Sequence, residues 1–358
     1  NERDKTESKQ LITEYVRNFL DGECIPGIAY EYDLYKKYLP TITLNEVNDL
    51  AKNWINSSGE NLVAVILGPE KESLKMPTEA EVKGFVKAAQ AADIKPYEDK
   101  AANKPLMSKK PVAGKIIAEN ENKALGITEL TLSNNVKVYL KPTDFKNDQV
   151  LMSAWSFGGT SLAADNDYLS ASISSFVIDQ SGVADFDITT LEKMLKGKIV
   201  EGGPYIDMLH QGMRGSASPA DLETLLQLIN LYFNKPRKDE TMFASLIEQQ
   251  RAMLQNRSSD PMQVFYDSVG YIMSSYNFRS KPRTVEMLKE CNLDKMYEFY
   301  KDRFSNANGM VFAFVGNFNT AQLKPLLETY IASLPSTDKI EAFKDLGIIP
   351  PKGKLEKT

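Results

Sequence analysis

Residue types that commonly perform catalysis are scarce in this sequence. Its 358 residues include one histidine, His210, and two cysteines, Cys24 and Cys291. Histidine is the usual general base and the commonest zinc ligand, and two distant cysteines are too few for a thiolate zinc site or a disulfide framework. These counts argue strongly against hydrolytic chemistry performed by this chain alone.

The single histidine is better explained by structure than by catalysis. His210 lies in an alternating pattern that predicts a strand, and Asp207 is the only Cys, Asp or Glu near it in sequence. A zinc site needs three or more protein ligands. We therefore predict a hydrogen-bonded structural histidine, and a ligand or general base is the less favoured alternative.

Two glycine-containing stretches predict turns rather than binding sites. Gly158-Gly159-Thr160-Ser161 follows a predicted strand, but it lacks the lysine and the spacing of a phosphate-binding loop. Gly202-Gly203-Pro204 is typical of a sharp turn before a strand, and a hinge is the alternative.

Acidic and hydroxyl side chains form no catalytic set either. The aspartate pairs Asp165 with Asp167 and Asp185 with Asp187 lack the apolar surroundings that raise a carboxyl pKa, so we interpret both as solvated loops. No serine pair has a histidine nearby in sequence for a Ser–His relay. We therefore assign no catalytic, cofactor-binding or metal-ligating residue.

The composition is that of a globular protein, with 42% apolar and 25% charged residues. The formal charge of −5 argues against a nucleic-acid partner, because nucleic-acid surfaces are built on excess positive charge. Runs such as Leu62–Leu67 and Met310–Val315 are far shorter than the roughly 20 apolar residues of a spanning helix, so we predict no membrane span.

One internal similarity predicts a duplicated unit. Leu44–Ala92 and Leu293–Ala332 share the order helix, polar turn, buried strand, glycine and helix. We predict that the two segments superpose, with Gly68 and Gly316 equivalent at the strand ends; chance similarity between two such units is the alternative. Each downstream helix is expected to be capped by a threonine, Thr78 or Thr320.

A proline-rich and lysine-rich stretch divides the chain in two. Beyond it we predict strands and helices in the order of a complete α+β domain, at 128–132, 136–140, 149–157, 165–180, 205–216, 218–233, 240–257 and 260–276. We expect the closing half of an α+β domain at 1–94, a linker at 95–123, a complete α+β domain at 124–335, and a linker towards a further domain at 336–358. The opening strands of the first domain are expected upstream of Asn1.

Several stretches, in this order and spacing, resemble the insulinase/pitrilysin type of zinc metallopeptidase, which includes the mitochondrial processing peptidase. The stretches that carry the resemblance are Gly22–Glu31, Tyr38–Val47, Gly215–Ser218, Lys235–Arg237, Phe243, Phe299–Asn317 and Tyr330–Pro335. The resemblance implies an α+β fold with antiparallel sheets packed with helices, present as the end of domain two and all of domain three.

The family's zinc motif is H-x-x-E-H, in which two histidines bind zinc and the glutamate activates water. In this sequence Ala171, Ser174 and Ser175 stand at those positions. The resemblance thus implies that this chain holds no zinc and is the non-catalytic part of a zinc metalloendopeptidase. Its expected role is part of the wall of the substrate chamber.

The resemblance also implies partners and a location. We expect zinc in the parent protein, an upstream catalytic half of the same polypeptide as partner, and a peptide or unfolded protein as substrate. The periplasm or cell envelope is the expected compartment. The alternative is a structural or assembly subunit on the same fold, similar to the core proteins of the bc1 complex, without peptidase activity.

Overall fold

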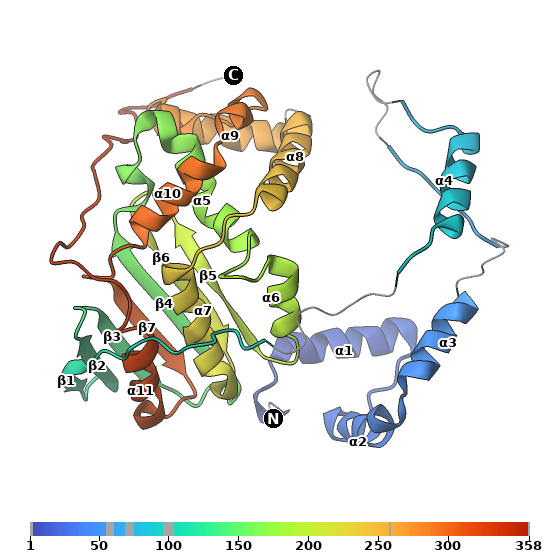
Figure 1. Ribbon diagram of the computed structural model, residues 1–358, viewed down its shortest axis with the longest axis horizontal. Helices are drawn as coiled ribbons and strands as arrows, with labels where there is room; N and C mark the ends of the chain where they lie inside the picture. The colour runs from blue at the N-terminus through green and yellow to red at the C-terminus, as the bar shows by residue number, and fades with distance from the viewer. Residues whose placement is uncertain (1–2, 55–60, 69–74, 96–103, 258, 357–358) are drawn as a thin grey trace. The chain divides into compact units, whose positions relative to one another are not determined.

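The computed structural model describes residues 3–54, 61–68, 75–95, 104–257 and 259–356. The chain divides into two compact units (Figure 1). We call Thr6–Asp99 the helical unit, and Asn1–Lys5 with Lys100–Thr358 the sheet unit.

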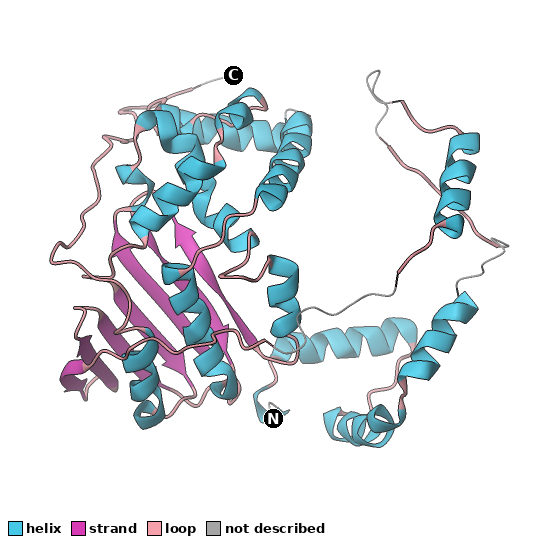
Figure 2. Cartoon of the chain, in the orientation of Figure 1, coloured by secondary structure: helices cyan, strands magenta, loops and turns pink. Residues whose placement is uncertain are grey.

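The sheet unit is built on one seven-stranded sheet in the order β1-β2-β3-β7-β4-β6-β5 (Figure 2). The strands are β1 (Ile116–Asn122), β2 (Ile127–Leu132), β3 (Lys137–Pro142), β4 (Val150–Phe157), β5 (Val200–Ile206), β6 (His210–Ala217) and β7 (Val311–Gly316). Neighbouring strands are antiparallel except for β3 and β7, which are parallel. The predicted α+β class is therefore confirmed, with one parallel pair in the sheet.

Helices are interspersed with the strands along the sheet unit. The α-helices are α5 (Tyr168–Gln180), α6 (Ile188–Met194), α7 (Leu222–Asn234), α8 (Glu240–Arg257), α9 (Pro261–Met273), α10 (Leu293–Arg303) and α11 (Thr320–Tyr330). Short 3₁₀ turns lie at Arg3–Lys5, Gly159–Leu162, Asp165–Asp167, Pro219–Asp221, Phe278–Ser280 and Glu286–Glu290.

Polar side chains cap the N-termini of several of these helices. They accept hydrogen bonds from backbone N–H groups that have no partner inside the helix. Ser218, Asp260 and Asn292 do so at the turn before α7, at α9 and at α10. The cap of α11 is Asn319, not the predicted Thr320, which is the first residue of the helix. Both residue types suit a cap, so the sequence pattern alone does not separate them.

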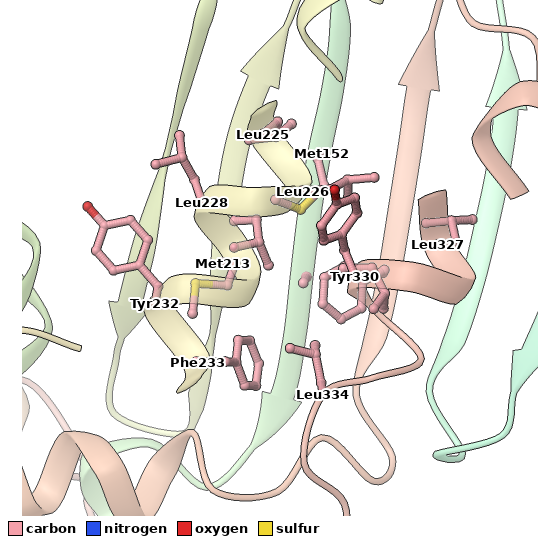
Figure 3. Packing of buried hydrophobic residues seen from close by; sticks show 14 of the residues in the cluster. Met152, Met213, Leu225, Leu226, Leu228, Tyr232, Phe233, Leu327, Tyr330 and Leu334 are labelled. Atoms are coloured by element: carbon pink, nitrogen blue, oxygen red, sulfur yellow. The ribbon is translucent and has the colours of Figure 1, made fainter. Parts of the chain in front are cut away.

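The core lies on one face of the sheet. Along β4 the side chains of Val150, Met152 and Ala154 are buried, whereas Leu151 and Trp155 on the opposite face remain 48% and 38% exposed. Burial of a valine or methionine side chain contributes about 1.5–3 kcal/mol, so this alternation fixes the register of β4. Figure 3 shows side chains of α7 and α11 packed over the strands, among them Leu225, Leu226, Phe233, Leu327 and Tyr330.

The helical unit contains α1 (Ser8–Asp21), α2 (Ile28–Tyr38), α3 (Leu44–Trp54) and α4 (Glu79–Ala91), with a 3₁₀ turn at Leu39–Thr41. Thr78 caps α4 as predicted, in a reciprocal capping box with Glu81. No residue of these four helices is buried. Most of their apolar side chains are exposed, for example Phe19 at 86% and Trp54 at 77%.

The duplication predicted for Leu44–Ala92 and Leu293–Ala332 fails in its central element. The apolar run Leu62–Leu67 is exposed and belongs to neither a helix nor a strand, whereas its counterpart is the buried strand β7. A strand needs a neighbour that takes up its backbone hydrogen bonds, and the described part of the helical unit contains no strand. The flanking helices α3 and α4 form as predicted.

Two predicted boundaries were wrong. The linker expected at 95–123 contains β1, whose largely polar sequence gives little sign of a strand and which pairs with β2 in the sheet. The single strand expected at 205–216 is two strands, β5 and β6, joined by a turn at Asp207–His210 that contains no glycine or proline.

The C-terminal segment 336–350, which we call the strap, is bound to the sheet unit without forming a helix or strand. Asn306 donates its side-chain amide to the carbonyl of Lys339 at 2.7 Å. Glu341 pairs with Arg303 at 2.8 Å, and the backbone N–H of Lys344 donates to Ser161 Oγ at 2.9 Å.

Candidate functional site

The positions aligned with the zinc motif lie on α5. Ala171 and Ser174 are buried there, and Ser175 is half-buried. The hydroxyl of Ser174 donates to the carbonyl of Ala171 at 2.8 Å. A methyl group and two hydroxyls do not supply the nitrogen, sulfur or carboxylate donors that zinc requires. These residues therefore do not fit a zinc ion.

The same helix has a clear packing role. Val177 of α5 packs against Leu293 and Met296 of α10 in a buried cluster. Ser170 Oγ accepts the backbone N–H of Asn292 at 3.0 Å, directly before α10. Side chains that face α10 thus serve the core of the sheet unit.

Within the described ranges, no group of three or more His, Cys, Asp or Glu residues could hold a metal ion. His210 begins β6, and its Nδ1 lies 3.5 Å from Asp207 Oδ1. The Asp207 carboxylate also accepts the backbone N–H groups of Leu209 and His210, which fixes the β5–β6 turn. Both groups therefore take part in the structure of that turn.

The stretch Gly158-Gly159-Thr160-Ser161 forms a turn, as predicted, with Gly159–Ser161 inside a 3₁₀ helix. Its backbone N–H groups donate to the β5–β6 turn and to the side chain of Gln211. A Cβ atom at Gly159 would lie 2.5 Å from the carbonyl oxygen of Asp207, and φ there is +60°, so glycine is required. None of these N–H groups is available to a phosphate.

The aspartates of the two formal pairs have separate structural contacts. Asp165 pairs with Arg279 at 2.7 Å, and Asp167 pairs with a lysine of α10. Asp187 caps α6, and the backbone N–H of Thr190 is the main cause that lowers the pKa of its carboxyl. Asp185 is exposed.

A groove follows β5, which is one of the two edge strands of the sheet. Its volume is about 770 Å³, and β5, α6 and the ends of α5 and α7 contribute to its lining. Gly202-Gly203-Pro204, predicted as a turn, lies within β5 and borders this groove. The prediction was wrong because antiparallel pairing with β6 holds all three residues in an extended strand.

Among the charged side chains of the groove, acidic ones outnumber basic ones. Asp179, Glu192 and Glu201 line it, with Arg214 as the cation. The Arg214 guanidinium lies 4.3 Å from the centre of the Tyr205 ring, in a cation–π contact.

Asp179 is a partly buried carboxyl in this groove. Burial raises its pKa, and hydrogen bonds from the hydroxyl of Tyr232 at 2.9 Å and the amide of Gln180 at 3.3 Å oppose that rise. Burial likewise raises the pKa of Tyr232. Both donors are neutral, and no described cation lies within ion-pair distance of Asp179.

Aromatic side chains form a second surface feature, which we call the aromatic patch: Trp155, Phe157, His210 and Phe343. The Phe157 ring lies 5.3 Å from the rings of Trp155 and His210, and 5.5 Å from that of Phe343 on the strap. Trp155 and Phe157 are 38% and 40% exposed, so their faces are open to contact with an apolar side chain.

Comparison with known proteins connects this fold to one family. Residues 290–357 match the peptidase M16 inactive domain, which covers α10, β7, α11 and the strap. Over 339 residues the chain is 28% identical to a zinc protease PQQL-like protein of Arabidopsis thaliana, which covers 93% of this chain and 32% of that protein. The chain resembles the non-catalytic segment of insulinase/pitrilysin-type (M16) peptidases.

A second relative and a solved structure are also similar to the chain. A probable zinc protease PqqL of Haemophilus influenzae is 21% identical over 94% of this chain and 36% of its own length. The crystal structure of the periplasmic protease PqqL from Escherichia coli matches 96% of this chain and 38% of its own, with 17% identity and a TM-score of 0.60. The chain thus spans about a third of the length of these curated relatives.

Sequence reasoning missed the groove, although one signal for it was present. A proline inside a strand pattern is typical of an edge strand, because the edge residue can lack an N–H without loss of a ladder hydrogen bond. Pro204 therefore pointed to an edge strand at 200–206. The neighbouring glycines favoured a turn and obscured it.

Proposed function

We propose that this chain is the non-catalytic part of a zinc-dependent metalloendopeptidase, in which it contacts and confines the polypeptide substrate. One observation carries the proposal. The fold of the chain, which includes α5, is similar to that of the periplasmic protease PqqL, yet Ala171, Ser174 and Ser175 occupy the motif positions and do not fit zinc. Such a domain contributes surface and shape rather than hydrolytic chemistry.

The proposal includes a catalytic half elsewhere in the same polypeptide. A chain with one histidine cannot contain H-x-x-E-H, whereas the relatives with about three times its length are zinc proteases. When bound in that half, zinc would supply an activated water for peptide-bond hydrolysis. We place the protein in the periplasm or cell envelope, which is supported by the periplasmic PqqL of Escherichia coli.

The domain organisation is part of the proposal. In the helical unit the helices α1–α4 bury no residue, and the apolar run Leu62–Leu67 is exposed. We infer that this unit closes an α+β domain whose sheet comes from another part of the polypeptide and takes in Leu62–Leu67 as a strand. The complete domain predicted at 124–335 must be extended to include β1.

Two surfaces of the sheet unit suit contact with an unfolded polypeptide. The aromatic patch offers half-exposed rings to apolar side chains, and Leu151 of β4 is exposed on the sheet face opposite the core. Confinement and orientation of a substrate lower reaction barriers by several kcal/mol, about 7–11 at the upper end. A wall without catalytic residues can therefore still determine the rate.

Cleavage of a fluorogenic peptide tests this division of labour. We expect no cleavage by this chain with added zinc, cleavage by the longer polypeptide that carries it, and a clear loss when residues 124–335 are deleted from that polypeptide. Cleavage by the chain alone, or full activity without residues 124–335, would contradict the proposal. Absence of cleavage by the longer polypeptide, with its zinc motif intact, would favour a structural subunit instead.

A further inference from the structure

The outer edge of β5 has backbone groups without partners in the described structure. In the hairpin with β6, Asp207 donates its N–H to His210, and Ser218 donates to Ile199. Because hydrogen-bonded pairs alternate along an antiparallel ladder, the odd-numbered residues of β5 bond to β6 and the even-numbered residues face outward. The outward groups belong to Val200, Gly202, Pro204 and Ile206.

Pro204 fits this assignment and limits which strand can be added. It stands at an outward position, where its missing N–H removes no bond to β6. It still presents an outward carbonyl, and Gly202 and Ile206 on either side present both an N–H and a carbonyl. An edge with one blocked donor is partly protected against non-specific pairing, yet it can bind a short extended segment.

The groove beside this edge has walls suited to side chains. Apolar residues of α6, among them Ile188 and Leu191, line the groove together with residues of β5. Side chains of an added strand alternate between the two faces, so the α6 wall would meet one of the two sets.

Asp179 gives the groove a preference for charge. A Cβ atom at Gly203 would lie 2.6 Å from Asp179 Oδ1, so the carboxylate reaches the strand only because residue 203 has no side chain. Its hydrogen-bond partners are neutral, and the other acids of the lining, Glu192 and Glu201, add negative potential. An ammonium or guanidinium group would supply the missing countercharge in a charge-assisted hydrogen bond.

We propose that the groove between β5 and α6 binds an extended polypeptide segment as an added strand, with a lysine or arginine of that segment placed at Asp179. This site rests on the proposed function and specifies which part of a polypeptide the wall holds. It binds by backbone pairing plus one basic side chain, and it involves none of the positions aligned with the zinc motif.

Backbone methylation of the ligand tests the pairing without altering the protein. A fluorescein-labelled peptide of about nine residues with high strand propensity and one central lysine is titrated with the 358-residue chain, and binding is followed by fluorescence anisotropy. Two further peptides carry N-methyl groups on alternate residues. In one peptide the methyl groups lie along one edge of the extended chain, and in the other peptide they lie along the opposite edge. We expect one of them to bind at least about tenfold more weakly and the other within about twofold of the parent peptide.

Charge is tested on both partners. We expect Asp179→Asn to weaken binding of the lysine peptide about tenfold, since the amide keeps the shape of the carboxylate but loses its charge. The affinity for a matched peptide with glutamine in place of lysine should change by less than about twofold. Asp185→Asn, which removes the same charge from an exposed position outside the groove, is the control and should leave both peptides unchanged.

Several results would overturn the inference. No saturable binding of the lysine peptide, equal weakening by both methylation patterns, or equal effects of Asp179→Asn on both peptides would each do so. These binding results are independent of cleavage by the longer polypeptide. If the peptide does not bind in the groove, the proposed function is still tested by the cleavage assay. If the longer polypeptide does not cleave its substrate, binding of the peptide in the groove still supports this inference.

Discussion

Removal of the Glu341 carboxylate should destabilise the sheet unit, because it leaves a buried cation with too few partners. The side chain of Arg303 is only 4% exposed, and its guanidinium contacts Glu341 at 2.8 Å and Asp302 at 2.5 Å. Its Nε is buried without a hydrogen-bond partner. Glu341→Ala removes the better shielded of the two anions, since Asp302 is 66% exposed and Glu341 is 23% exposed.

The size of the effect follows from this geometry. Loss of one partner from a fully buried pair costs about 3–5 kcal/mol. Asp302 remains and water reaches part of Glu341, so we expect about 2–3 kcal/mol for Glu341→Ala. For a domain of this size that loss corresponds to a decrease of about 4–12 °C in the melting temperature.

Urea unfolding followed by tryptophan fluorescence measures this change. The chain has two tryptophans, and Trp54→Phe leaves Trp155 of β4 as a probe of the sheet unit. Glu356→Ala, which removes an exposed glutamate, should change the free energy of unfolding by less than about 0.5 kcal/mol.

The double variant Arg303→Met with Glu341→Ala shows whether the loss of stability in Glu341→Ala comes from the unpaired Arg303 charge or from lost packing. It should be more stable than Glu341→Ala alone, because no cation is then left buried. Equal stability of Glu341→Ala and the parent, or a double variant less stable than the single one, would refute this reasoning.

Three further predictions concern buried polar groups. Since burial raises the folded-state pKa of Asp179, its charge destabilises the fold above that pKa. Asp179→Asn should therefore raise the melting temperature at neutral pH. The gain in the free energy of unfolding should shrink, by at most about 1.4 kcal/mol per pH unit, as the pH falls towards 3.8. Burial also raises the pKa of the Cys291 thiol, so iodoacetamide at pH 7.5 should label exposed Cys24 first in a mass-spectrometric time course, and equal rates would contradict this. Arg279→Met should lower the free energy of urea unfolding by about 3–5 kcal/mol, because it leaves the Ala163 carbonyl without its donor, removes one of the two donors to the Thr160 carbonyl and leaves Asp165 without its cation. A change below about 1 kcal/mol would rule this out.

Local sequence patterns predicted the elements whose signals lie within a few residues. Ser218 and Pro219 followed by leucines at helical spacing predicted α7, and its buried face against the sheet agrees with that pattern. Alternation along 149–157 predicted β4 to within one residue. The absence of a zinc motif on α5 followed from residue identity alone.

Features that depend on distant partners could not be predicted in this way. Leu62–Leu67 has the composition of a buried strand, but the described residues of the helical unit include no strand beside it, so composition alone predicted the wrong element. The contact between Gly203 and Asp179 joins two elements that are separated by α6, and no local pattern indicates it. The strap is similar: Glu341 and Lys344 are fixed by Arg303 and Ser161, far away in sequence.

The central claim is that this chain contacts polypeptide without hydrolysing it. One titration tests both parts: a fluorescent unfolded polypeptide is mixed with the purified chain and zinc, anisotropy reports binding, and mass spectrometry of the same sample reports cleavage. We predict saturable binding with the polypeptide left intact. Cleavage of the polypeptide, or no binding at any concentration of the chain, would contradict the claim.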